Sequence, residues 1–230
     1  MHTIWLARNA IQFSFLKITL HNTLTKISTL VTMSSVNSTD NCVIGDVDFL
    51  NSLLIPSSYR RIKDIVPVIW KPPTITWVKA NTDGSVIGLN SSCGGIFRDF
   101  TGDFLGGFSS NLGEGTVLEA KLTCLMLAME FAASHNLSRL WLESDSSCAV
   151  HAFKNYSAIP MRFRNRWHNC MQLGLFVICS HIYREGNCCA DALASLGHDL
   201  PDTTWFHILP TSLSIDFTRD RNGLSNYRLP

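Results

Sequence analysis

Hydrophobic positions along the chain change their spacing several times, and these changes predict its secondary structure. Between residues 75 and 111, three short runs alternate apolar or β-branched residues with polar ones, which is typical of strands. From residue 116 to 135, apolar residues recur three and four positions apart, which is typical of a helix with one buried face. The same patterns predict two further strands and three shorter helices. The predicted strands are 75–81, 93–98, 104–111, 139–143 and 176–183, with a loop over 84–92 after the first of them. The predicted helices are 116–135, 146–155, 162–173 and 187–196, and Ser146 is the expected cap of the second helix.

The order of these elements predicts an α/β fold. Three strands follow one another directly, then come a helix, a strand, two helices, a strand and a helix. Successive strands joined by short turns predict an antiparallel meander. The two later strands each follow a helix, so we expect them to lie parallel to a strand of the meander.

The flanking segments are less regular. Residues 3–20 show helical recurrence of apolar residues, and residues 33–60 are rich in Ser, Asn and Thr, which predicts a linker. Pro72 and Pro73 prevent a helix, so we place the start of the domain just after them. The sequence therefore predicts an N-terminal segment and linker over 1–70, a domain over 75–200 and an irregular tail over 201–230.

Composition excludes several classes of protein. Of the 230 residues, 46% are hydrophobic and 16% are charged, which is enough apolar material for a sizeable core. The net charge of +1 means that any surface for nucleic acid must be local. The eight cysteines contain no C-x-x-C pair, and a reducing, intracellular compartment fits them best. No run of eighteen apolar residues occurs, so we expect no membrane span. We expect a monomer.

The first 39 residues have an unusual composition. They contain no Asp or Glu, three Lys or Arg residues and many Ser and Thr. This composition is typical of an organelle transit peptide. A second explanation, ancestry in a retroelement, depends on the motifs described below.

Three aspartates fall at equivalent points of the predicted fold. Asp83 and Asp145 each end a predicted strand, and Asp191 lies in the first turns of the last helix. Ligands of open α/β sheets bind at the carboxyl ends of strands, so parallel neighbours would bring these side chains together. Each Asp alone is more simply a cap or turn residue. Clustered carboxylates repel one another unless a cation neutralises them, and their hard oxygen ligands favour Mg²⁺.

Five ordered motifs resemble the reverse-transcriptase-like ribonuclease H domains common in plants. They cover about residues 75–200. The motifs are Asn81-Thr-Asp-Gly84, Gly94-Gly-Ile-Phe-Arg-Asp99, Leu118-Glu-Ala, Glu143-Ser-Asp-Ser146 and the stretch from Tyr183 to Ala194. Residues 4–13 also resemble the segment that precedes such domains in retroelement-derived reading frames, which favours a retroelement origin over a transit peptide.

The resemblance implies a fold, an activity and a cofactor. It implies a mixed five-stranded sheet with helices on both faces. It also implies cleavage of the RNA strand of an RNA–DNA hybrid, with two Mg²⁺ ions held by four carboxylates. Asp83, Asp145 and Asp191 match three of these carboxylates. The partner expected is nucleic acid, either an RNA–DNA hybrid or double-stranded RNA.

The fourth carboxylate of the family pattern is a Glu on the long helix, and this chain departs from the pattern there. With Leu122 and Leu125 aligned, the position is occupied by Lys121, and Glu119 lies two residues earlier. Two residues turn a helix by about 200°, so Glu119 serves as a ligand only if the alignment shifts. An ammonium at position 121 would pair with the aspartates and compete with a metal ion. The sequence therefore predicts weakened or lost hydrolysis, with a non-catalytic nucleic-acid-binding module and an inert retroelement remnant as the alternatives.

Candidate nucleic-acid contacts lie in two places. Asn81, Thr82 and Gly84 adjoin Asp83 and could contact sugar and phosphate groups. A second group begins the predicted helix 162–173, where three alternating arginines and a tryptophan could form a basic, stacking patch. This second group consists of Arg162, Arg164, Arg166 and Trp167. A solvated helix face with a buried tryptophan is the equally weighted alternative.

Overall fold

A computed structural model describes residues 4–5, 8–9, 11–12, 19–36 and 65–228. The chain divides into two compact units, residues 1–63 and 64–230, and each is considered by itself. The second unit thus begins before Pro72 and Pro73, where the sequence analysis placed the domain start. Trp70 explains the difference, because its ring is 2% exposed and its Nε1 donates a hydrogen bond to Asn81 Oδ1 at 2.8 Å.

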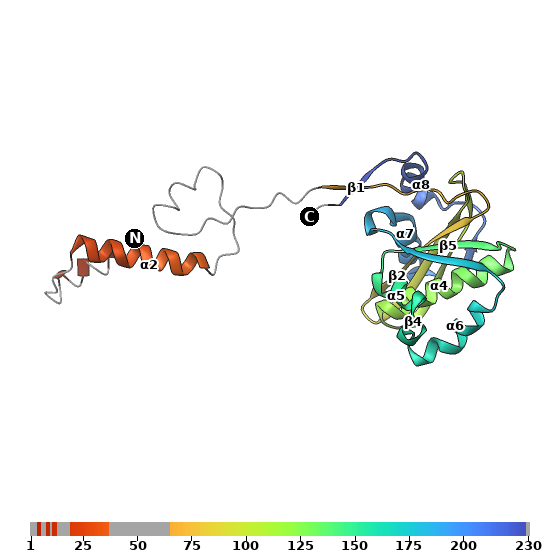
Figure 1. The fold of residues 1–230 in the computed structure, drawn as a ribbon, viewed down its shortest axis with the longest axis horizontal. Helices are drawn as coiled ribbons and strands as arrows, with labels where there is room; N and C mark the ends of the chain where they lie inside the picture. Colours follow the sequence, from red (N-terminus) through yellow and green to blue (C-terminus); the bar gives the residue numbers. More distant parts are fainter. Residues whose placement is uncertain (1–3, 6–7, 10, 13–18, 37–64, 229–230) are drawn as a thin grey trace. The chain divides into compact units, whose positions relative to one another are not determined.

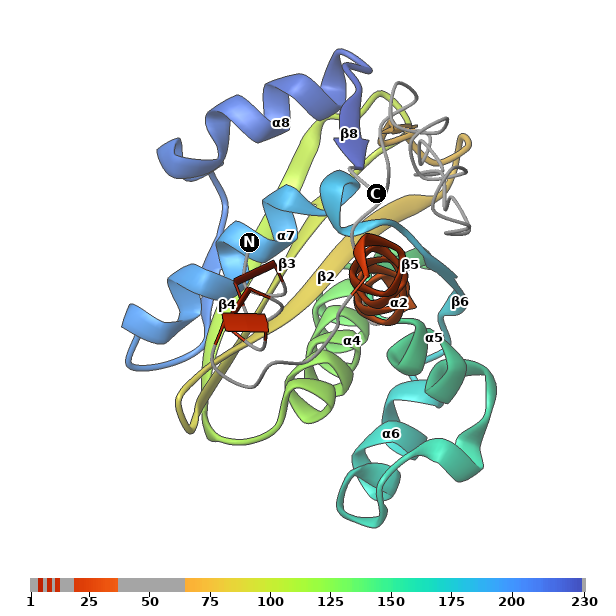
Figure 2. The same ribbon diagram turned by 90° about the vertical axis from the view of Figure 1, so that its left-hand side faces the viewer.

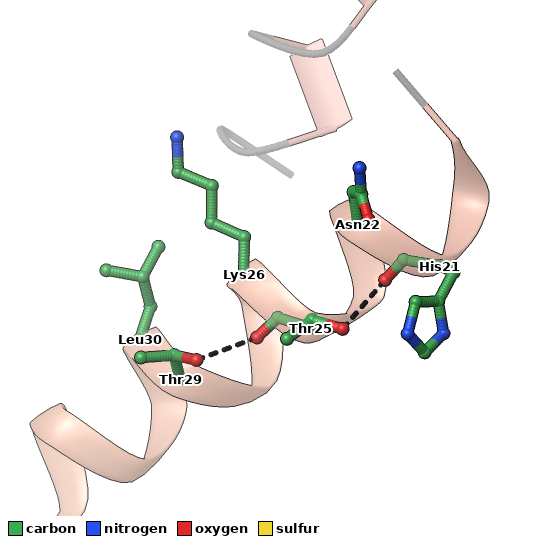
Figure 3. A pocket seen from close by; sticks show the side chains of 6 residues that line it. All are labelled: His21, Asn22, Thr25, Lys26, Thr29 and Leu30. Carbon is green, nitrogen blue, oxygen red and sulfur yellow. Dashed lines mark hydrogen bonds between the residues drawn. The ribbon is translucent and has the colours of Figure 1, made fainter. Parts of the chain in front are cut away.

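The first unit contains the helix α2 (Leu20–Val36), preceded by helical residues at 4–5, 8–9 and 11–12. The helix continues four residues into the predicted linker, and the rest of that linker lies outside the described residues. A shallow hollow runs along α2 (Figure 3). Thr25 and Thr29 line it, and their hydroxyls donate to the carbonyls of His21 and Thr25 at 2.9 Å each. Since these hydroxyls are bonded to their own helix, we assign no site there.

The second unit is built on a six-stranded mixed sheet with the strand order β6-β5-β2-β3-β4-β7. Strands β2, β3, β4 and β7 are successively antiparallel, and β5 and β6 lie parallel to β2 on its other side. The mixed sheet with a meander and added parallel strands is therefore confirmed, with one strand more than expected. The strands are β2 (Val78–Ile87), β3 (Asn90–Arg98), β4 (Phe104–Glu114), β5 (Arg139–Ser144), β6 (Phe176–His181) and β7 (Thr204–Phe206).

Helices cover both faces of this sheet, as expected. The long helix α4 packs on β2 and β3 from one side, and α7 packs on the same strands from the other (Figures 1 and 2). Two glycines allow these close approaches, because a Cβ on Gly84 would lie 2.6 Å from the Lys121 backbone nitrogen and one on Gly94 would lie 2.3 Å from that of Ala194. The helices are α4 (Val117–Ser134), α5 (Ser147–Lys154), α6 (Arg164–Met171), α7 (Cys188–Leu196) and α8 (Ser214–Arg221). Short 3₁₀ helices lie at Tyr156–Ala158, Met161–Phe163, Arg184–Gly186 (η4), Gly197–Asp199 and Thr211–Leu213.

The first strand of the domain is longer than predicted. It continues through Asp83 to Ile87, and residues 84–87 pair with β3, so the predicted loop at 84–92 is a tight hairpin. Gly88 makes its turn with a φ of +62°, a value that favours glycine. Asp83 consequently lies inside β2, one residue beyond the last pair that β2 forms with β5, Thr82 with Ser144.

The tail also differs from the prediction, because it is structured. It adds β7 to the sheet, then forms α8 and a strand β8 (Asn226–Arg228) that pairs with β1 (Val66–Val68). Leu213 and Phe217 are buried against Ile96, Cys189 and Leu193. Their spacing of four residues was a helical signal in the sequence. In the part of the chain that the structure describes, no helix has the length and apolarity to cross a membrane.

Candidate functional site

Asp83 and Asp145 meet where β2 and β5 stop pairing. β5 ends at Ser144, so Asp145 directly follows it. The next residue, Ser146, is the N-cap of α5, and its hydroxyl accepts a hydrogen bond from the backbone N–H of Ala149 at 3.2 Å. This N-cap, predicted from the sequence, fixes the turn that holds Asp145. The parallel pairing thus brings these two carboxylates together at the carboxyl ends of the strands.

Lys121 joins the two carboxylates. Its Nζ donates hydrogen bonds to Oδ1 of Asp83 and to Oδ1 of Asp145, the latter at 2.5 Å. The helix α4 can present Lys121 there because it approaches β2 closely at Gly84. The three side chains are 12%, 6% and 13% exposed, so the group is mostly buried but open to water at one edge. We call Asp83, Asp145 and Lys121 the open centre.

The charges of the open centre influence one another. Burial raises the pKa of Asp83 to about 6, against the opposing effect of the adjacent Lys121 ammonium. Burial also disfavours the charged form of Lys121, but the two carboxylates outweigh that effect and raise its pKa. Lys121 is therefore a cation at neutral pH. One ammonium thus neutralises part of the charge of two carboxylates without any external ion.

Glu119 lies elsewhere. Its backbone N–H donates to the Thr116 hydroxyl at 3.4 Å, and its carboxylate accepts a bond from the Thr116 backbone N–H at 3.0 Å, which together form a capping box at the start of α4. The carboxylate also pairs with Arg162. Both residues line a second hollow, of about 360 Å³. The helix register therefore places Lys121, and not Glu119, at the two aspartates.

Asp191 occupies the first turn of α7, as the sequence predicted. Its Oδ1 accepts a bond from Arg184 Nη2 at 3.4 Å, and its side chain is 42% exposed. It is not among the described groups that bond to Lys121. Asp191 therefore stands apart from the open centre, with an arginine of its own. Arg184, which the sequence analysis did not select, is signalled only by its place in the short connection between β6 and α7.

Asn81 and Thr82 are not available as surface contacts. Asn81 is fully buried, and its amide donates to Glu143 Oε2 at 3.1 Å and to Asn187 Oδ1 at 3.2 Å. The Thr82 hydroxyl donates to the Glu143 carbonyl at 3.0 Å. Gly84 serves the contact with α4 described above. The side chains of Asn81 and Thr82 are therefore engaged within the fold, and contact of this segment with nucleic acid stays a prediction.

Asn81 belongs to a larger cluster of buried charges, which we call the sealed cluster. It comprises the ion pairs Lys79–Glu143 and Arg98–Asp220, each at 2.8 Å, and the amide of Asn81 between them. The Arg98 guanidinium also stacks on Trp70, 3.7 Å from the ring centroid. The sequence analysis missed this cluster. Its signal was the presence of Lys79 and Arg98 within otherwise apolar strands.

The predicted basic patch is largely occupied by contacts within the protein. Arg166 forms a bidentate pair with Glu130 at 2.8 and 2.7 Å, and Arg164 Nε donates to the Ile159 carbonyl at 3.0 Å. Trp167 is 2% exposed and packs edge-on against Phe153, so it cannot stack on a base. Arg162, with its side chain 57% exposed, is the member of this group best placed to reach a ligand.

A family model described as "Reverse transcriptase-like" matches residues 81–197, just over half of the chain. The chain belongs to the reverse transcriptase-like family. The matched region contains the open centre, Asp191 and most of the sealed cluster. It leaves out Trp70 and the tail with Asp220, which the structure shows to be parts of the same compact unit.

Three known proteins illustrate the similarity. A protein of Arabidopsis thaliana named as a ribonuclease H protein is 34% identical over 185 residues, which are 77% of this chain and 29% of that protein. The chain therefore spans less than a third of this relative's length. The crystal structure of an RNase H1 from Halobacterium salinarum matches at 24% identity with a TM-score of 0.48, over 54% of this chain and 98% of that one. The N-terminal RNase H domain of a Mycobacterium tuberculosis protein matches at 18% identity with a TM-score of 0.49, over 54% and 94%.

The residues of this reverse transcriptase-like domain do not fit the two Mg²⁺ ions that the sequence resemblance implied. Among residues 65–228 and the described residues of the first unit, no three His, Cys, Asp or Glu side chains are grouped to hold a metal ion. The Lys121 ammonium bonds to Asp83 and Asp145, two of the carboxylates that the resemblance assigns to such ions. A cation fixed at this point repels a metal ion and competes for the same oxygens. The Lys121 site is therefore a charge-compensated centre of a different kind.

Proposed function

We propose that this domain binds nucleic acid duplexes that contain RNA, such as RNA–DNA hybrids, and that hydrolysis of the RNA strand is weak or lost. Family membership supports the nucleic-acid partner. The observation that carries the loss of hydrolysis is the position of Lys121 between Asp83 and Asp145. A two-metal mechanism needs free carboxylate oxygens at this point, and here they are bonded to an ammonium.

Two exposed arginines are the proposed phosphate contacts. Arg162 and Arg184 have side chains that are 57% and 77% exposed. Each pairs with a single carboxylate, Glu119 or Asp191, in a solvent-exposed geometry. Such exposed pairs contribute little stability, so a phosphate can take the place of the carboxylate.

A paired binding and cleavage experiment tests this function. Fluorescence anisotropy of a labelled RNA–DNA hybrid should show binding by the full chain with a Kd of about 1–100 μM. Gel analysis of the same hybrid in Mg²⁺ or Mn²⁺ should show little cleavage by the natural chain. Changing Lys121→Glu should increase the cleavage rate by about tenfold or more, since it restores a carboxylate and removes the competing cation.

Lys154→Glu is the matched control, because Lys154 is exposed on α5. It should leave the cleavage rate unchanged. Robust cleavage by the natural chain that disappears in Glu119→Gln would contradict the proposal, since Glu119 would then be the missing ligand. Absence of any hybrid binding would instead favour an inert retroelement remnant.

A further inference from the structure

One face of the sheet is covered by α7 only in part. The main contacts of α7 are with β2, β3 and β4, and β5 and β6 lie beyond it. Helix α5 packs on β6 from the opposite side, where Val177 and Cys179 contribute to the main core. Because side chains alternate along a strand, Phe176, Ile178 and Ser180 point to the face away from α5. We call the side of β5 and β6 that faces away from α5 the outer face.

The outer face presents aromatic and apolar side chains to solvent. Phe176 is 69% exposed and Ile178 is 44% exposed. Phe176 pairs with Arg139 and Ile178 pairs with Trp141 in the parallel register, so β5 adds a cation and a second ring to the same face. Trp141 is half-buried, and its Nε1 donates to Ser180 Oγ at 2.7 Å, which fixes the orientation of the indole.

The charge of the outer face is positive. At the end of the outer face near Ser180 and His181 lies a hollow of about 660 Å³, whose lining includes Trp141, Tyr183 and the exposed Lys71. Glu143 is the one carboxylate in this lining, and Lys79 neutralises it at 2.8 Å. Arg139, which donates to the Thr76 hydroxyl at 3.1 Å, has no carboxylate among its described partners. Two cations, Lys71 and Arg139, are thus left without a matching negative charge on this face.

The hollow adjoins the open centre. His181 lines it, and its Nε2 is 3.1 Å from the carbonyl oxygen of Asp145. The outer face therefore begins beside the backbone of Asp145 and extends along β5 and β6 away from it. A nucleic-acid strand that passes the open centre could continue onto this face.

We propose that the outer face of β5 and β6 binds single-stranded nucleic acid by stacking unpaired bases on Phe176 and Trp141, with phosphates at Arg139 and Lys71. Exposed aromatic rings on a sheet, flanked by cations, bind unpaired bases in this way. A duplex does not offer the same contact, because its bases already stack on one another. A second copy of the chain is the less suitable occupant, since a two-fold interface would bring Arg139 and Lys71 towards their own symmetry mates. This inference goes beyond the proposed duplex binding and uses a different surface.

Anisotropy of the full chain with a labelled twelve-nucleotide single-stranded RNA, and with the DNA of the same sequence, tests the proposal. Phe176→Ala should weaken single-strand binding about tenfold, because each stacked base contributes binding free energy of this order. Phe176→Tyr should retain binding, which separates stacking from folding. Arg139→Gln should also lower the slope of log K against log salt by about 0.7, the value for one lost phosphate contact on a single strand.

Phe100→Ala is the matched control, since Phe100 is 47% exposed in the turn between β3 and β4. It should leave single-strand binding unchanged. Binding of the RNA–DNA hybrid, measured in parallel, should be the same for Phe176→Ala and the natural chain, so that failure of the duplex function is recognised separately. Absence of single-strand binding by the natural chain, or equal loss in Phe100→Ala, would overturn the proposal. So would a natural dimer in sedimentation that Phe176→Ala converts to a monomer.

Discussion

Two clusters of buried charge lie side by side in this domain, and β2 contributes to both. Asn81 belongs to the sealed cluster, and Asp83, two residues later, belongs to the open centre. In each cluster a lysine pairs with carboxylates. Lys79 pairs with Glu143 in the sealed cluster, and Lys121 pairs with Asp83 and Asp145 in the open centre. The two differ in the ratio of cations to carboxylates and in how far water can reach them.

The sealed cluster is enclosed by the fold. Lys79 Nζ donates to Glu143 and to the Lys71 carbonyl at 2.7 Å, and it lies 4.0 Å from the centroid of the Trp141 ring. The other pair, Arg98 and Asp220, has side chains only 1% and 2% exposed. These contacts connect the strands to the segment before β2 and to α8. The sealed cluster therefore serves the structure.

The open centre has one cation for two carboxylates and an edge that faces water. Its three side chains are 6–13% exposed, and Asp83 and Asp145 each contact Lys121 through one oxygen. The Lys121 ammonium, a group of the chain itself, bonds to the carboxylates that the family resemblance assigns to metal ions. The comparison indicates that one lysine on α4 gives the open centre the same kind of charge compensation as the sealed cluster.

The largest effect should come from the sealed cluster. Asp220→Ala leaves the Arg98 guanidinium buried without its partner, so we expect a loss of about 3–5 kcal/mol in the free energy of unfolding. Urea denaturation followed by circular dichroism measures the change. Asp202→Ala, an exposed carboxylate in the same tail, should stay within about 0.5 kcal/mol of the natural chain. Added Mg²⁺ should not restore the stability of Asp220→Ala. If Asp220→Ala were as stable as Asp202→Ala, the sealed cluster would not have the structural role that separates it from the open centre.

A smaller effect is expected at the open centre. Lys121→Met leaves Asp83 and Asp145 facing each other, but the centre is partly open to water and Asp83 can take up a proton, so we expect a loss of about 2 kcal/mol. Millimolar Mg²⁺ should recover part of this loss, because a metal ion can then bind the two carboxylates. Thermal denaturation with and without Mg²⁺ measures both quantities. Lys154→Met is the control. Its free energy of unfolding should equal that of the natural chain, and Mg²⁺ should not change it. If Lys121→Met gained nothing from Mg²⁺, the idea that Lys121 occupies a cation site would be wrong.

The sequence predicted the framework well where local patterns matched the final packing. The alternating strands, the apolar stripe on α4 and the cap at Ser146 all depend on short stretches of chain, and the structure contains each of them. The proximity of Asp83, Asp145 and Lys121 also followed from a parallel pair of strands and one helix register. These predictions succeeded because each depended on the periodicity of one short stretch of chain or on one pair of neighbouring strands.

Other features depend on contacts between distant residues, which no local pattern reveals. The sequence left Trp167 open between a stacking and a buried role, and its contacts with Phe153 and the core decide for the buried one. The tail looked irregular because its helix is short and mostly polar, yet Leu213 and Phe217 anchor it over α7 and β3. Arg98 pairs with Asp220 across 122 positions of sequence. Only the folded chain brings such groups together, so their roles became evident in the structure alone.

The smallest effect concerns Glu119 and decides which helix position belongs to the centre. Thr116→Ala removes the hydroxyl that caps α4, so we expect a loss of about 1 kcal/mol in the free energy of unfolding. The same change releases Glu119 from its capping box. If Glu119 only caps the helix and pairs with Arg162, Thr116→Ala should leave the Mg²⁺ response of the Lys121→Met protein unchanged when the two substitutions are combined. If Glu119 can reach the carboxylates, its release should strengthen that response. Thermal denaturation of the double variant across a Mg²⁺ titration distinguishes the two outcomes, and an enhanced response would move the fourth carboxylate back to position 119.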